Sequence, residues 1–335
     1  MKNLARNPRS TAGCALILLG LTLKATLFCA QQTPVEQKAG LPRDKARIEL
    51  KKRGVELSPH SFVETIDKED AVLVKLFLAA GVDPNSDDHG TTVLMIASGL
   101  HPPSPNGGGC IGGIIYACYS VAQRNSKGAL DIVRSLLENG SAVQAKDSDG
   151  KTALHHAAAG ANVEVARILI AHGADVNASD NHGTTAVNVV SLLNDDTSVT
   201  ELLLNHGAEI NNKNGSSPGL LYAAAAGHVR SLRLLISKGA NINSAGSQGT
   251  TVLMEAASGG HVEVIDTLLD LGAAVDTQDA QGFSALMYAA FNGRENSVAL
   301  LLKRGANKAL RNHSGETAVD IAAKRKFTNV IGLLE

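Results

Sequence analysis

Hydrophobic and polar positions along most of this chain follow a pattern that predicts pairs of short helices. Leu154, Ala157 and Ala158 have the i, i+3, i+4 spacing of one buried helix face. After a short break, a second apolar face is made of Val163, Val165, Leu169 and Ile170. Gly173 then ends the second helix, because glycine tolerates the left-handed conformation that a helix end often adopts. Polar residues follow and predict a projecting loop before the next pair.

A hydroxyl residue stands just before several of the predicted first helices. There its oxygen can accept hydrogen bonds from amides that have no partner within the helix. These residues are Thr152, Thr251, Ser284 and Thr317. Helices this short are marginal alone, so we expect contacts between neighbouring pairs to hold them.

Glycine recurs along the chain in two series, each with a period of about 33 residues. One series consists of Gly150, Gly183, Gly249, Gly282 and Gly315. Only Ser216 breaks it. The other series consists of Gly140, Gly173, Gly207, Gly239, Gly272 and Gly305. Two series in step with each other indicate internal repeats that stack into a solenoid.

The amino-acid sequence between the glycines repeats as well. Segments that begin at Gly150, Gly249 and Gly282 read GKTALHHAA, GTTVLMEAA and GFSALMYAA, and each leads into a second helix and then Gly-Ala. This pattern resembles the ankyrin-repeat family, in an exported, bacterial-type form, over about residues 58–335. The resemblance implies an all-α solenoid of helix-turn-helix units with projecting inter-repeat loops, and about seven full repeats.

The repeat pattern also divides the chain. Residues 31–43 have little hydrophobic content and predict a disordered tether. Residues 44–89 predict an N-terminal helical cap and a first partial repeat, and residues 90–335 the ankyrin repeats. The Pro/Gly-rich stretch at about 99–126 is an insertion within one repeat, and such insertions form surface loops, often on the binding side.

Two cysteines, Cys110 and Cys118, lie in the insertion. An even pair in an exported chain predicts a disulfide, and the alternative is a flexible loop with two free thiols. No Cys-x-x-Cys spacing or zinc pattern is present.

The first 30 residues differ from the rest. Basic residues precede the apolar run 12–23, and residues 1–30 contain no acidic residue. This order predicts a signal peptide over residues 1–30, cleaved after Ala30, and hence a periplasmic or secreted protein. The apolar run is short for a membrane span, which needs about 20 residues. The alternative is an uncleaved segment that anchors the chain to a membrane.

Charge and composition exclude several classes of function. Removing residues 1–30 leaves 31 − 4 = 27 basic residues against 32 acidic ones, without a Lys/Arg stripe, which disfavours nucleic acid as a partner. His155 and His156 are adjacent, so on a helix they point about 100° apart and do not form one metal-binding face. No set of residues assembles an acid, a base and a nucleophile. We therefore expect no enzyme activity, cofactor, metal or small-molecule substrate.

The resemblance implies that one side chain per repeat is free on the concave face of the first helices. Alignment of the repeats puts Ile96, His156, Val189, Tyr222, Glu255, Tyr288 and Ile321 at this position. We expect His156, Tyr222, Glu255 and Tyr288 to contact a partner, because tyrosines are frequent in binding hot spots. The alternative is that the tyrosines only cover neighbouring helices.

These expectations converge on an exported, non-enzymatic scaffold that binds another protein through the concave helix face, the loop tips and the insertion. Two alternatives stay open. One is a membrane-tethered assembly or regulatory factor, and the other is a redox-responsive binder that uses Cys110 and Cys118.

Overall fold

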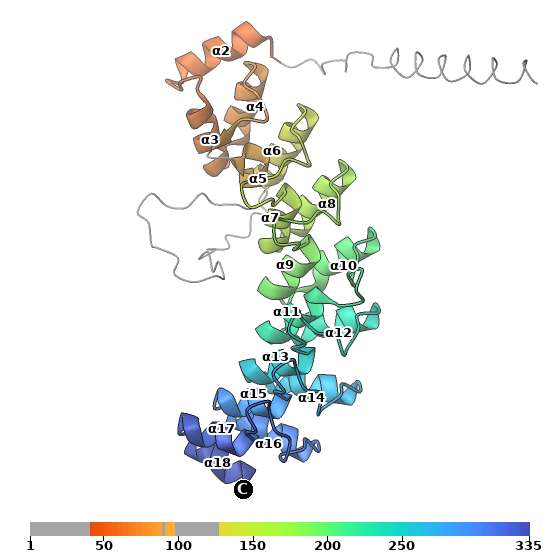
Figure 1. The fold of residues 1–335 in the computed structure, drawn as a ribbon. Helices are drawn as coiled ribbons and strands as arrows, with labels where there is room; N and C mark the ends of the chain where they lie inside the picture. The colour runs from red at the N-terminus through yellow and green to blue at the C-terminus, as the bar shows by residue number, and fades with distance from the viewer. Residues whose placement is uncertain (1–40, 89–90, 98–126) are drawn as a thin grey trace, which may run out of the picture.

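The computed structural model describes residues 41–88, 91–97 and 127–335, which form an elongated stack of helix pairs (Figure 1). The first helices of the pairs are α3 (Pro59–Asp67), α5 (Val93–Ala97), α7 (Ala153–Ala159), α9 (Ala186–Leu193), α11 (Pro218–Ala226), α13 (Val252–Gly259), α15 (Ala285–Phe291) and α17 (Ala318–Arg325). The second helices are α4 (Ala71–Ala79), α6 (Lys127–Glu138), α8 (Val163–Ala171), α10 (Thr197–Asn205), α12 (Val229–Ser237), α14 (Val262–Asp270), α16 (Glu295–Lys303) and α18 (Thr328–Leu334). The predicted all-α solenoid is confirmed.

The core lies between the two helix rows and is built from small and aliphatic side chains. Leu154 and Leu220 on first helices and Leu169 and Leu203 on second helices are at most 1% exposed. Each first helix packs on the first helix of the next pair, as α11 does on α9 and α13. Fully buried alanines such as Ala157 allow this close approach.

The predicted hydroxyl caps are present on three of the first helices. The hydroxyl oxygens of Thr251, Ser284 and Thr317 each accept a hydrogen bond from the backbone amide three residues later. These bonds satisfy amides that the helix itself leaves unpaired.

The glycines of both series have a left-handed backbone with positive φ, and some members of the first series are in addition closely approached by a neighbouring loop. Gly173 ends the α8 turn with φ 87°, and a Cβ there would meet open space, so the left-handed backbone alone requires glycine. Gly282 has φ 80°, and a Cβ there would also lie 2.9 Å from the amide nitrogen of His313. Where Ser216 breaks the series, Gly215 takes the left-handed position one residue earlier, with φ 75°.

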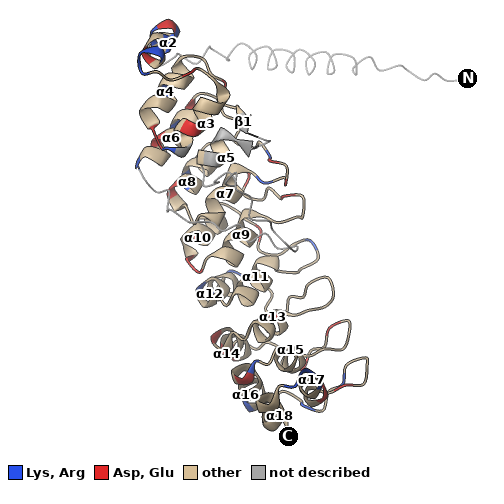
Figure 2. Ribbon diagram, turned by 90° about the vertical axis from the view of Figure 1, so that its left-hand side faces the viewer, with Lys and Arg blue, Asp and Glu red and all other residues tan. Residues whose placement is uncertain are grey.

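Polar loops, here called fingers, project from the stack on the side of the first helices (Figure 2). Neighbouring fingers are hydrogen-bonded to one another. The amide of Ala280 donates to the carbonyl of Gln248 at 2.9 Å, and the amide of His313 donates to the carbonyl of Gln281 at 3.0 Å. In the first finger, β1 (Asp87–Asp88) pairs antiparallel with β2 (Thr91–Thr92).

Asparagine side chains connect successive repeats at the start of the fingers. Asn177 Nδ2 donates to the Gly207 carbonyl at 3.1 Å, and Asn177 Oδ1 accepts from the Glu209 amide at 2.8 Å. Asn85 makes the same pair of bonds to the carbonyl of Gly140 and the amide of Ala142. Each repeat therefore fixes the position of the next.

The N-terminal end is closed by α2 (Arg43–Lys52), which packs on α4. Ala46 and Leu50 of α2 are buried, and its arginines Arg43 and Arg47 donate to the carbonyl of Ala80 at 3.0 and 3.2 Å. The polar outer face of α2 suits a terminal unit. Helix α2 begins at the last residue of the predicted tether.

The predicted signal peptide, residues 31–40 of the tether, and the insertion with Cys110 and Cys118 lie outside the described residues. In the ranges that the structure describes, no helix has both the length and the apolar character needed to cross a membrane.

Candidate functional site

The predicted contact row occupies one equivalent position on successive first helices. His156 lies on α7, Tyr222 on α11, Glu255 on α13 and Tyr288 on α15. The first helices stand between the second helices and the fingers (Figure 2). The four side chains differ in whether the finger that precedes each helix supplies a hydrogen-bonding group for them.

Tyr288 is held by the finger that precedes it. Its hydroxyl donates to Asp279 Oδ2 at 2.7 Å, and its ring lies 5.5 Å from that of Phe283. Asp279 also accepts from two amides of the same finger, those of Gln281 and Phe283. Burial and the hydrogen bond to Asp279 raise the pKa of Tyr288. Tyr288 therefore contacts its own finger, and its contact with a partner stays a prediction.

His156 makes the same connection in its own repeat. Its Nε2 donates to Asp147 Oδ2 at 2.9 Å, and its side chain is only 3% exposed. The expectation that His156 presents a free side chain is therefore wrong, because the finger aspartate draws the ring into the framework. Burial alone would raise the pKa of Asp147, but hydrogen bonds from His156 and the Lys151 amide lower it.

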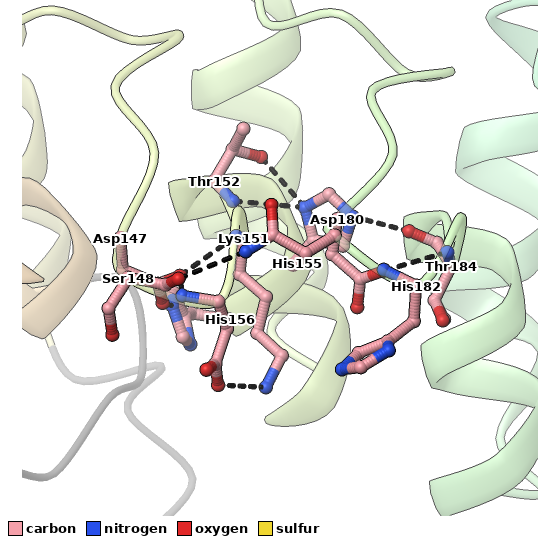
Figure 3. Close-up of polar contacts among 11 residues, drawn as sticks. Asp147, Ser148, Lys151, Thr152, His155, His156, Asp180, His182 and Thr184 are labelled. Atoms are coloured by element: carbon pink, nitrogen blue, oxygen red, sulfur yellow. Dashed lines mark hydrogen bonds and ion pairs between the residues drawn. The ribbon is translucent and has the colours of Figure 1, made fainter.

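His155 joins α7 to the next finger (Figure 3). Its Nδ1 accepts from the Thr152 amide at 3.1 Å, and its Nε2 donates to the carbonyl of Thr184 at 3.0 Å. Burial lowers the pKa of His155, which keeps the ring in the neutral form that these two bonds require. His155 is therefore part of the connection between two repeats.

The turn histidines also connect repeats. His228 Nδ1 lies 3.0 Å from the carbonyl of Ser191, and His261 Nε2 lies 2.9 Å from that of Ala225. No cluster of three metal-ligating side chains occurs in the described parts of the chain.

Glu255 differs from His156 and Tyr288, because its finger offers no aspartate. The paired aspartates stand nine residues before His156 and Tyr288, and the residue nine before Glu255 is Gly246. No hydrogen bond or ion pair from the described residues reaches the Glu255 carboxylate. The side chain is half-buried, and this burial raises the pKa of its carboxyl group.

Tyr222 on α11 is the most exposed member of the predicted contact set. Its side chain is 36% exposed, and within the described residues its hydroxyl has no hydrogen bond. Its finger is one residue shorter, with the turn glycine at Gly215 and Asn212 in the place of the aspartate. The Asn212 side chain instead accepts from the amides of Asn214 and Ser216.

The remaining row positions are less accessible. Ile321 is 4% exposed, Val189 is half-buried, and the side chain of Ile96 lies outside the described residues. The sequence reasoning missed two exposed apolar side chains, Leu193 at 37% and Phe291 at 39%. Their signal was present, since they follow Val189 and Tyr288 by four and three residues, one helical turn on the same face.

A shallow cavity of about 480 Å³ lies elsewhere, between the bases of two fingers. It is lined by Gln144, Lys146, Thr152, Asp175, Asn177, Ala178 and Ser179. Its long polar side chains already bond to the framework, as Gln144 does to the Gly173 carbonyl and Lys146 to the Ser179 carbonyl. This cavity is therefore part of the inter-repeat packing.

A family model described as ankyrin repeats in three copies matches residues 115–214, 192–279 and 220–312, more than half of the chain. The chain belongs to the ankyrin repeat family. The crystal structure of the human ASB11 ankyrin repeat domain is similar to this ankyrin array, at 28% sequence identity and a TM-score of 0.56. The likeness covers 62% of this chain and 93% of that domain. The search of curated proteins gave no match.

Membership confirms the resemblance to ankyrin repeats that the repeated glycines and GKTALHHAA-type segments predicted, and the exported, bacterial-type form stays a prediction. Ankyrin repeats generally mediate protein–protein interaction, and the family is typically a non-enzymatic scaffold. Among the predicted contact residues, His156 and Tyr288 are bonded to finger aspartates, whereas Tyr222 and Glu255 have no hydrogen-bonding partner in residues 41–88, 91–97 and 127–335.

Proposed function

We propose that this ankyrin array is an exported, non-enzymatic scaffold that binds another protein through the face of its first helices. The finger tips and the insertion at about 99–126 add further contacts. The observation that carries the proposal is the pair Tyr222 and Glu255, whose side chains have no hydrogen-bonding partner in the part of the framework that the structure describes.

Rigidity supports this proposal. The Asn177 bonds, the finger-to-finger bonds and the histidine bridges fix each first helix relative to the next. A face that is already ordered loses little conformational freedom when a partner binds. The exposed Tyr222, Leu193 and Phe291 supply the aromatic and apolar area from which hot spots are built.

Export is supported by the sequence. The basic residues ahead of the apolar run 12–23 and the polar residues after Ala30 follow the order of a cleaved signal. The mature chain is then expected to begin at Gln31. Mass spectrometry of the native N-terminal peptide tests this, and a peptide that retains residues 12–30 contradicts it.

Affinity capture from the native exported fraction tests the binding role. Tyr222→Ala, and separately removal of residues 101–125, are compared with wild type by quantitative mass spectrometry. The matched control is Leu271→Ala, because Leu271 is a 45% exposed apolar residue at the end of α14, away from the first helices. We expect a stoichiometric protein that is lost with Tyr222→Ala and kept with Leu271→Ala. Equal capture by all folded variants contradicts the proposal.

A further inference from the structure

Among the side chains on the face of the first helices, the carboxylate of Glu255 gives the most specific indication of the chemical group that binds there. The six other row positions hold histidine, valine, tyrosine or isoleucine, so the fold does not need a carboxylate there. Its finger has glycine, Gly246, where the α7 and α15 repeats have the hydrogen-bonding aspartate. An acidic group that is half-buried and unpaired is costly to the folded chain. A cost of this kind is characteristic of binding sites, where the partner supplies the missing charge.

The neighbours of Glu255 are two tyrosines, one on the helix at each side. Tyr222 stands at the same position on α11 and Tyr288 on α15, and both helices pack on α13. The charge of Glu255 acts on Tyr288, which places the two side chains near each other. Asp279, the carboxylate of the next finger, already accepts hydrogen bonds from the Tyr288 hydroxyl and two amides.

The residues one turn further along α11 and α13 are small. They are Ala225, Ala226, Ser258 and Gly259. Larger side chains, Leu193 and Phe291, stand at the corresponding places on α9 and α15. The carboxylate is therefore flanked by aromatic rings along the stack and by small residues along its own helix.

We propose that Glu255 binds an arginine side chain of the partner protein, with Tyr222 and Tyr288 on either side of the guanidinium. This inference rests on the proposed function and names the chemistry of the contact. A guanidinium is planar, pairs with a carboxylate through two parallel hydrogen bonds and stacks on aromatic rings. Lysine offers a point charge without the planar fork, so it fits this arrangement less well.

Selection from a displayed library of random dodecapeptides tests the inference without knowledge of the native partner. The bait is the chain without residues 1–30, and the same library is selected against Glu255→Gln and Glu263→Gln. Glu263→Gln is the matched control, because it removes the same charge from an exposed residue of α14. Circular dichroism melting shows that each bait is folded.

We expect peptides selected on wild type and on Glu263→Gln to share an arginine at one position. That arginine disappears from peptides selected on Glu255→Gln. Synthetic copies of the selected peptides are expected to lose about tenfold or more in affinity for Glu255→Gln, and a similar amount when the arginine is replaced by glutamine. Replacement by lysine is expected to recover only part of the loss.

Two outcomes overturn the arginine and leave the scaffold in place. One is a set of tight peptides without a basic residue in common, and the other is equal affinity for wild type and Glu255→Gln. Self-association of the wild-type chain that Glu255→Gln abolishes would put a second copy there, and it overturns the proposal as stated. Failure to select any peptide on a folded bait would count against the proposed function itself.

Discussion

The α7 and α13 repeats have nearly the same backbone and use the same position in opposite ways. In the α7 repeat, Asp147 reaches His156, and both side chains are almost inaccessible. In the α13 repeat, Gly246 replaces the aspartate, and Glu255 is half-buried without a hydrogen bond or ion pair from any described residue. One residue at the base of a finger therefore decides whether the first-helix side chain belongs to the framework or to the face. The following experiments test this comparison, from the largest expected effect to the smallest.

A buried apolar core is common to all the repeats, and substitutions in it should lower the stability of the molecule most. Leu203 of α10 is fully buried between the α8 and α12 repeats. Leu203→Ala is expected to lower the free energy of unfolding by about 2–5 kcal/mol, because it removes buried methyl groups and leaves a cavity. Urea unfolding followed by circular dichroism measures the change. An unchanged midpoint would contradict the placement of Leu203 in the core.

Replacement of Asp147 tests how much the hydrogen bond between the finger and His156 contributes to stability. Its carboxylate accepts from His156 Nε2 and from the amides of Asp149 and Lys151. Asp147→Ala leaves buried donors unsatisfied and is expected to cost about 1–3 kcal/mol. Asp149→Ala is the control, because the Asp149 side chain is 46% exposed and its loss should cost about 0.5 kcal/mol or less. Equal losses for the two variants would show that the buried pair has no special weight.

The stability contributed by Asp147 should also depend on pH. Its pKa is lowered in the folded state, so the contribution is complete above the ordinary pKa of an aspartate and is lost as pH falls through the lowered value. The difference between wild type and Asp147→Ala should therefore be larger at neutral pH than in acid. Melting curves at both pH values measure it, and a difference that grows in acid would reverse the assignment.

The sequence predicted the fold well and the face only in part. The glycine series, the hydroxyl caps and the Leu-Ala-Ala stripes depend on local chemistry, so they specify the repeat without a structure. Whether a side chain of the contact row is exposed depends instead on the residue nine positions earlier. Alignment of the repeats compares each row position only with its equivalents and does not include that residue. Asp147 and Asp279 are also ordinary turn residues, since each accepts amides of its own finger. A rule that considered both residues together would have separated His156 from Glu255.

Exchange of the two arrangements is the direct test of that rule. The pair Gly246→Asp and Glu255→Tyr recreates in the α13 repeat the Asp279 and Tyr288 connection. Gly246 does not have a positive φ, and a Cβ there would come no closer than 3.9 Å to the Thr250 carbonyl oxygen, so an aspartate fits the backbone. A double-mutant cycle is expected to give a favourable coupling of about 1 kcal/mol. Additive effects of the two substitutions would mean that the finger residue does not control the position.

The smallest expected effect is that of Glu255→Gln, which should raise stability at neutral pH, whereas Leu203→Ala and Asp147→Ala lower it. Burial raises the pKa of Glu255, so the folded state holds the proton more tightly than the unfolded chain does. Stability from this group is therefore complete below the ordinary glutamate pKa of 4.5 and is lost as pH rises through the raised value. Glu255→Gln, which has no charge to bury, should melt slightly above wild type at neutral pH and lose that advantage in acid, whereas Glu263→Gln should show no such difference. If Glu255→Gln is more stable than wild type, the carboxylate costs the fold stability, which indicates that Glu255 is kept for binding. Substitutions at functional sites often stabilise a fold because they remove a strained or unpaired group. A loss of stability at neutral pH would show instead that the carboxylate has a partner within the array.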